Sequence, residues 1–158
     1  TITYEKGSWI MHMLRVRLGD AAFDKMLGEV VRRYRYKTVT TEGFRAVAAE
    51  FMPRGSDDPK LEAFFEQWVY GTGIPTLKLA HSVAGKSPKI RLRGTITQSG
   101  VSEDFSASVP VEVQLPGRKP VVNWVRTSSE PVQFTIDLPR APSKVVLAPE
   151  HALLTTKN

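Results

Sequence analysis

The five residues from Gly71 to Pro75 divide the sequence into two parts with different hydrophobic periods. Two glycines and a proline in this segment cannot continue a helix without a large energetic cost. Apolar residues recur at helical spacing before the segment, and they alternate with polar residues after it. We therefore expect an α+β chain of two parts, with helices in residues 1–74 and strands in residues 75–158.

The first two predicted helices lie on either side of Gly19. Residues 1–18 carry a broad apolar stripe, which requires a packing partner. The second helix is expected to begin with Asp20 as its N-cap. Its buried face is predicted from residues at helical spacing: Phe23, Met26, Leu27, Val30, Val31 and Tyr34.

Two further helices complete a predicted bundle segment of about four helices. The third follows Thr40 or Thr41 and is ended by Pro53. The fourth has Asp58 as its expected N-cap and Pro59 at its first helical position, where the missing N–H costs nothing. Its apolar face is formed by Leu61, Phe64, Phe65 and Trp68.

Residues 75–158 are predicted to form an antiparallel, immunoglobulin-like β-sandwich of about six or seven strands. Alternating apolar residues place strands that begin near Leu77, Ile90, Phe105, Val121, Val132 and Val145. Pro110 interrupts the third strand, so we expect a bulge or an edge there. Lys89, Arg91 and Arg93 alternate with apolar residues and are expected on a solvated strand face.

Charge and composition exclude several classes of function. The net charge is +6, but we find no nucleic-acid-binding motif. We therefore expect a solvent-exposed basic surface rather than a nucleic-acid partner. No apolar run approaches the roughly 18 residues needed to span a bilayer, and the chain does not start with a signal-peptide pattern. The sequence therefore does not predict a cellular compartment. The absence of cysteine excludes disulfides and thiolate sites.

The three histidines do not predict a metal site in this chain. His12, His81 and His151 are far apart in the sequence, and no pair has the spacing of a His-Glu-x-x-His helix. His81 is in phase with Leu79 and Val83, so we expect a hydrogen-bonded histidine at the edge of the sandwich core. No hydrolytic triad or phosphate-binding loop is apparent either.

Tyr4 is the one candidate catalytic residue. It lies in the first turn of the first predicted helix, near backbone N–H groups that lack intrahelical acceptors. A hydroxyl there can be aimed at a neighbouring group. The residues alone favour the alternative, in which Tyr4 only packs at a helix start.

The segment from Tyr4 to Arg15, Tyr-Glu-Lys-Gly-Ser-Trp-Ile-Met-His-Met-Leu-Arg, resembles the segment just downstream of the zinc site in the M1 family of zinc aminopeptidases. Further motifs follow in the family's order: Leu-Gly-Asp at 18–20, Thr-Thr-Glu-x-Phe at 40–44, Phe-x-Gln-Trp-Val at 65–69, Gly-Ile-Pro-x-Leu at 73–77 and Val-Leu-x-Pro at 146–149. Ala148 stands where the family commonly has Asp, which affects a local turn contact.

The resemblance implies that residues 1–74 are the later helices of a peptidase catalytic domain and that residues 75–158 are its small β-sandwich. It assigns to Tyr4 a hydrogen bond to the oxyanion that forms during peptide hydrolysis. His-Glu-x-x-His, the downstream Glu ligand and the Gly-x-Met-x-Asn loop do not occur in this sequence. We therefore expect zinc in a larger parent and none in this chain.

The expected partners are the upstream catalytic and N-terminal domains of that parent, together with its peptide substrates. The chain begins with Thr1 and soon enters a predicted helix, so we expect sequence before it. By itself it is expected to be an inactive fragment of an aminopeptidase. The competing hypothesis is a non-catalytic interaction or scaffold module of an M1-like protein without a working zinc site.

Overall fold

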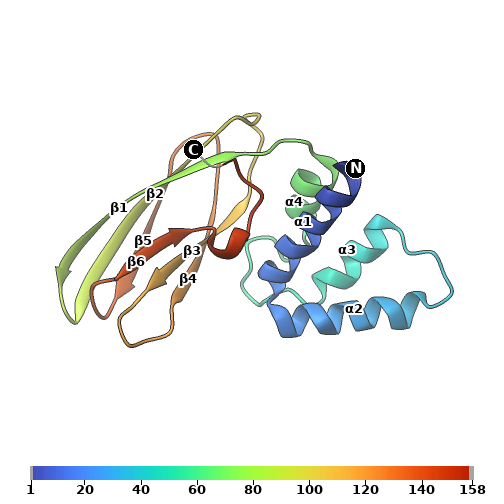
Figure 1. Cartoon of the computed structure of the whole chain (residues 1–158), viewed down its shortest axis with the longest axis horizontal. Helices are drawn as coiled ribbons and strands as arrows, with labels where there is room; N and C mark the ends of the chain where they lie inside the picture. Colours follow the sequence, from blue (N-terminus) through green and yellow to red (C-terminus); the bar gives the residue numbers. More distant parts are fainter. Residues whose placement is uncertain (1, 157–158) are drawn as a thin grey trace. The chain divides into compact units, whose positions relative to one another are not determined.

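The computed structural model describes the backbone of residues 2–156 and the side chains of residues 5–156. It divides into two compact units, Thr1–Thr72 and Gly73–Asn158 (Figure 1). Within the described residues, the first unit contains four α-helices and a π-helical turn, and the second contains six strands in two sheets. The predicted α+β organisation is confirmed.

The helical unit follows the predicted order. Its elements are α1 (Ile2–Leu18), α2 (Asp20–Tyr34), α3 (Thr41–Ala49), α4 (Glu62–Phe65) and the π-helical turn η1 (Glu66–Tyr70). They enclose a core of buried residues that includes Leu14, Met26, Val47 and Phe65. Val31, predicted on the buried face of α2, is 66% exposed, because the core covers only part of that face. None of the helices among the described residues is long and apolar enough to cross a membrane.

The turn between α1 and α2 depends on Gly19, and the N-cap predicted at Asp20 is wrong by one residue. Gly19 has a φ of 85°, which residues with a side chain rarely adopt. Its N–H donates to the Arg15 carbonyl at 2.8 Å, and its own carbonyl accepts from the Phe23 N–H at 2.9 Å. Asp20 is therefore already helical, and its carboxylate accepts from Arg15 Nε at 2.7 Å.

The start predicted for the fourth helix is also wrong. The helix begins at Glu62, because Leu61 before it adopts a left-handed conformation with a φ of 56°. The buried Asp58 still caps the helix, although it lies four residues before the helix start. Its carboxylate accepts from the N–H groups of Ala63 at 3.3 Å and Phe64 at 2.8 Å. The capping residue was thus correctly identified, but the intervening chain forms turns instead of helix.

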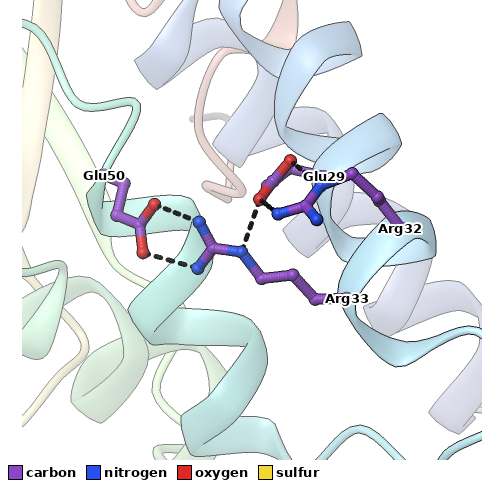
Figure 2. A network of polar contacts seen from close by, with 4 residues as sticks. All are labelled: Glu29, Arg32, Arg33 and Glu50. Atoms are coloured by element: carbon purple, nitrogen blue, oxygen red, sulfur yellow. Dashed lines mark hydrogen bonds and ion pairs between the residues drawn. The ribbon is translucent and has the colours of Figure 1, made fainter.

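An ion-pair network joins α2 to α3 (Figure 2). The Arg33 guanidinium donates to both carboxylate oxygens of Glu50 at 2.7 Å, and its Nε donates to Glu29 at 2.5 Å. Arg32 also donates to Glu29, at 2.5 and 2.9 Å. The hydrogen bonds from Arg32 and Arg33 lower the pKa of Glu29 from 4.5 to about 2.

The sandwich contains β1 (Thr76–Lys86), β2 (Lys89–Ser99), β3 (Ser108–Gln114), β4 (Val121–Arg126), β5 (Val132–Leu138) and β6 (Lys144–Leu147). The strands form two three-stranded antiparallel sheets with the orders β1-β2-β5 and β4-β3-β6 (Figure 1). Both apolar clusters between them combine residues of the two sheets, as when Leu92 of β2 packs with Val113 of β3. Lys89, Arg91 and Arg93 are exposed, as predicted.

Two details of the sandwich differ from the prediction. Pro110 lies without a bulge in the central strand β3, in register with Trp124. The strand tolerates this proline because the ladder between β3 and β6 ends at it. The Pro110 carbonyl still accepts from the Ala148 N–H at 2.8 Å. Only the second hydrogen bond of the Pro110–Ala148 pair is lost, because proline has no N–H to donate. His81, predicted as a hydrogen-bonded histidine at the edge of the sandwich core, lies on the edge strand β1 and is exposed.

The pKa of Glu29 predicts a loss of stability in acid. Because the folded-state pKa is depressed, the stabilisation is present above pH 4.5 and is lost as the pH falls towards 2. Urea denaturation followed by circular dichroism at 222 nm at low salt should show this decrease, and Glu29→Gln should reduce it. Glu66→Gln is the control, because the exposed Glu66 makes no ion pair in the part of the chain that is described. If stability decreased equally with falling pH in Glu29→Gln and Glu66→Gln, the decrease could not be assigned to Glu29.

Candidate functional site

The site predicted from the sequence lies at the amino-terminal end of α1. The backbone of Tyr4 is in the first turn of this helix, as expected, and its side chain lies outside the described residues. What the structure describes is how the helix that carries Tyr4 is held. Three features hold it: a hydrogen bond near its start, a buried middle and a buried arginine near its end.

Lys6 fixes the start of α1. Its Nζ donates to the Gly71 carbonyl at 2.6 Å, across 65 residues of sequence. Lys6 is half-buried and lies only two residues after Tyr4. The bond thus joins the segment that begins Tyr-x-Lys-Gly to the chain that follows Phe-x-Gln-Trp-Val.

The acceptor is a glycine at the end of the π-helical turn η1. The Gly71 N–H donates to the Glu66 carbonyl at 2.9 Å, which is the i to i−5 bond of a π-helix. A Cβ at this position would lie 2.6 Å from the Gln67 carbonyl oxygen, so a side chain cannot be accommodated without a shift of the backbone. The Gly71 carbonyl lies beyond the end of the helix, so no N–H of that helix can donate to it. The Lys6 ammonium group donates to it instead.

The end of η1 is also tied to α3. The Tyr70 hydroxyl donates to Glu42 Oε1 at 2.8 Å, and Glu42 accepts from Arg45 Nε at 2.8 Å. The hydrogen bond to Glu42 raises the pKa of Tyr70, and the same bond lowers the pKa of Glu42. Tyr70 and Gly71 are therefore held from two sides, by α3 and by α1.

Arg17 fixes the other end of α1, and sequence reasoning missed it. It is 8% exposed, and its Nη2 donates to Ser56 Oγ at 3.0 Å and to the Asp57 carboxylate. Arg17 is itself buried and therefore needs these partners, although the Asp57 carboxylate lies at the surface. A signal was available, because Arg17 lies at i+4 from Met13 and i+3 from Leu14 on the apolar face, where a charge requires a partner.

The middle of α1 is buried. Met13 is 2% exposed and Leu14 is fully buried, so this part of the helix is embedded in the core of its unit. His12 is exposed on the opposite side, with its ring edge-on to Trp9 at a centroid separation of 6.2 Å. Packing and the two polar anchors together give α1 a fixed position within the helical unit.

The histidines do not come together as a metal centre. Among residues with described side chains, no three of the His, Cys, Asp and Glu residues form a cluster that could hold a metal ion. His12 belongs to the helical unit, whereas His81 and His151 both border a hollow in the sandwich. The described residues therefore do not fit a zinc site by themselves.

Lys6→Met removes the bond to Gly71 while keeping a long apolar side chain. A hydrogen bond from a charged donor contributes about 1.5–3 kcal/mol, and less where water reaches the donor. Amide hydrogen exchange should accelerate at residues 6–10 and at Gly71, whereas the amides of Met13 and Leu14 should be unaffected. Lys25→Met, at an exposed lysine of α2, is the matched control. Unchanged exchange at residues 6–10 would show that Lys6 does not fix this end.

Comparison with known proteins finds a family match for the helical unit and a similar fold for nearly the whole chain. Residues 1–68 match the model of the peptidase family M1 domain. Leucine aminopeptidase 2-2 of Meyerozyma guilliermondii is 33% identical over 76 residues, which are 47% of this chain and 12% of that protein. Leucine aminopeptidase 2-1 of the same organism is 29% identical over 79 residues, which are 49% of this chain and 12% of that protein.

The solved structure of Legionella pneumophila aminopeptidase A in complex with aspartic acid resembles 96% of this chain, with a TM-score of 0.66 and 16% sequence identity. At that identity the likeness concerns the fold alone. This chain covers 17% of that structure's chain, and it spans 12% of the length of the curated relatives above. The match to the family model extends over nearly all of the helical unit, and through that unit the chain is similar to the M1 family of peptidases.

Proposed function

We propose that this chain is part of a zinc-dependent aminopeptidase of the M1 family that removes amino-terminal residues from peptides. The family match of residues 1–68 and the aminopeptidase relatives support this function. The sequence lacks His-Glu-x-x-His, and its described residues form no metal cluster. The proposal therefore assigns the zinc ligands to other parts of a larger parent protein, with which this chain would complete the active site.

In this proposal Tyr4 stabilises the transition state. Its phenol donates a hydrogen bond to the oxyanion that forms when water attacks the peptide carbonyl. A tyrosine has a reference pKa of about 10 and is therefore a neutral donor at pH 7. One oxyanion donor typically contributes about 3–4 kcal/mol, because it is already aimed at the position where the charge develops.

The observation that best supports this role is the bond between Lys6 Nζ and the Gly71 carbonyl. An oxyanion donor is effective only if the protein holds it in place before the reaction. Lys6 holds the same helical turn that carries Tyr4, and it does so through the family's Tyr-x-Lys-Gly segment. We assign Lys6 as a positioning residue that acts through Tyr4 and does not contact substrate.

Tyr4→Phe in the intact parent tests the role of the phenol. The substitution removes one hydroxyl, so kcat should fall by roughly 10² to 10³ with a much smaller effect on KM. Steady-state hydrolysis of an aminoacyl coumarin amide measures both constants. Tyr36→Phe is the matched control, because the Tyr36 side chain is 93% exposed. An unchanged kcat in Tyr4→Phe would remove Tyr4 from the mechanism.

The same assay separates this function from the alternative of a non-catalytic module. A parent with a working zinc site should hydrolyse the substrate and lose activity to a chelator, whereas a scaffold protein should show no turnover. The isolated chain should be inactive in either case. Zinc-dependent turnover by the isolated chain would contradict the proposal that the ligands lie elsewhere.

A further inference from the structure

Strand β1 leaves an open edge on the sandwich. It is the first strand of the sheet β1-β2-β5, so its other side has no neighbouring strand among the described residues. The exception is Thr76 at its start, which forms an isolated parallel bridge with Thr156. From Leu77 to Lys86 the backbone can therefore pair with another extended segment, which is the general property of an exposed sheet edge.

The inner side of this edge is largely apolar and only partly covered by the sandwich core. Leu79 and Val83 pair across the strands with Ile96 and Leu92, which are buried in the sandwich, so all four residues face the inner side of the sheet. A hollow of about 470 Å³ lies beside Leu79, bordered also by Leu77 and His81 of β1 and by Val145 and Leu147 of β6. Val83 is 43% exposed. Apolar side chains of an added strand would have a place there.

The outer side of the same sheet is basic. Lys78 and Lys86 of β1 and Lys89 and Arg93 of β2 are exposed and make no ion pair with any described residue. Lys86 and Lys89 even lie directly opposite each other, an arrangement that costs stability unless an anion is near. Arg91 is different, because its Nε donates to Asp137 at 2.9 Å.

These charges also distinguish between the possible occupants of the edge. A second copy of the chain would add its own Lys78 and Lys86 to a surface that is already positive, and like charges on adjacent strands repel. Carboxylates at alternate positions of an added strand would instead meet the lysines and Arg93. Lysines on an edge strand are a common protection against self-association, so they oppose self-pairing and favour an acidic partner.

We propose that the β1 edge binds an acidic, extended segment of a partner protein by strand addition. The segment alternates apolar and acidic residues. Its backbone pairs with β1, its apolar side chains enter the hollow beside Leu79 and cover the exposed Val83, and its carboxylates face the basic outer side. In this mode of recognition the main-chain bonds provide affinity and the alternating side chains provide specificity.

Binding of a synthetic peptide to the 158-residue chain tests this proposal. The probe is a fluorescein-labelled decapeptide of alternating Val and Glu, measured by fluorescence anisotropy at low salt. We expect saturable binding and slower amide exchange along residues 77–85. Added salt should weaken binding through charge screening. A Val and Lys decapeptide should not bind, and a peptide of the same composition with its five Glu residues in one block should bind at least tenfold more weakly.

Two double variants test the position of the site. Lys78→Glu with Arg93→Glu should weaken binding of the alternating peptide at least tenfold. Arg118→Glu with Lys119→Glu changes the net charge equally in the loop between β3 and β4, and it should have little effect. Circular dichroism and thermal unfolding of both variants verify that the sandwich is intact.

Several results would overturn the proposal. Equal binding of the blocked peptide would indicate attraction by net charge alone. Protection outside residues 77–85 would place the peptide elsewhere. No binding by the alternating peptide, or a concentration-dependent dimer that protects β1, would show that an acidic strand is not the occupant of the edge.

Discussion

The hydrogen bond from Lys6 Nζ to the Gly71 carbonyl is the contact on which this account of the helical unit depends. It joins residues that are 65 positions apart and links the start of α1 to the residue that follows η1. A carbonyl past a helix end needs a donor from elsewhere, and the absence of a side chain at Gly71 allows the close packing of η1. The start of α1 and the end of η1 therefore hold each other.

The rest of α1 makes this contact effective. Leu14 embeds the helix in the core, and the buried Arg17 ties its far end to Ser56 and Asp57. A single anchor would leave the helix free to pivot, whereas anchors at both ends define its position and direction. If Tyr4 acts as an oxyanion donor in the parent, this arrangement provides the pre-organisation that the role requires.

The sequence predicted the succession of elements but not the contacts between them. Helical spacing and alternation reveal which face of an element is apolar, so the order of the helices and strands was predicted correctly. Which part of a face is covered depends on the opposite element, and this explains why Val31 and His81 are exposed. The bonds of Lys6 and Arg17 join residues 65 and 39 positions apart. The apolar face of α1 indicates that Arg17 needs a partner, but no local pattern encodes which residues the partners are. The left-handed Leu61 likewise shifted a helix start that the capping signals at Asp58 had placed earlier.

A double-mutant cycle in the intact parent tests most directly whether Lys6 acts by holding the turn of Tyr4. The kcat is measured for Lys6→Met both with Tyr4 present and with Tyr4→Phe. The account predicts that Lys6→Met lowers kcat by roughly tenfold or more when Tyr4 is present and has little further effect in Tyr4→Phe, because groups that act as a unit are strongly non-additive. An equal loss of kcat in both backgrounds would contradict it.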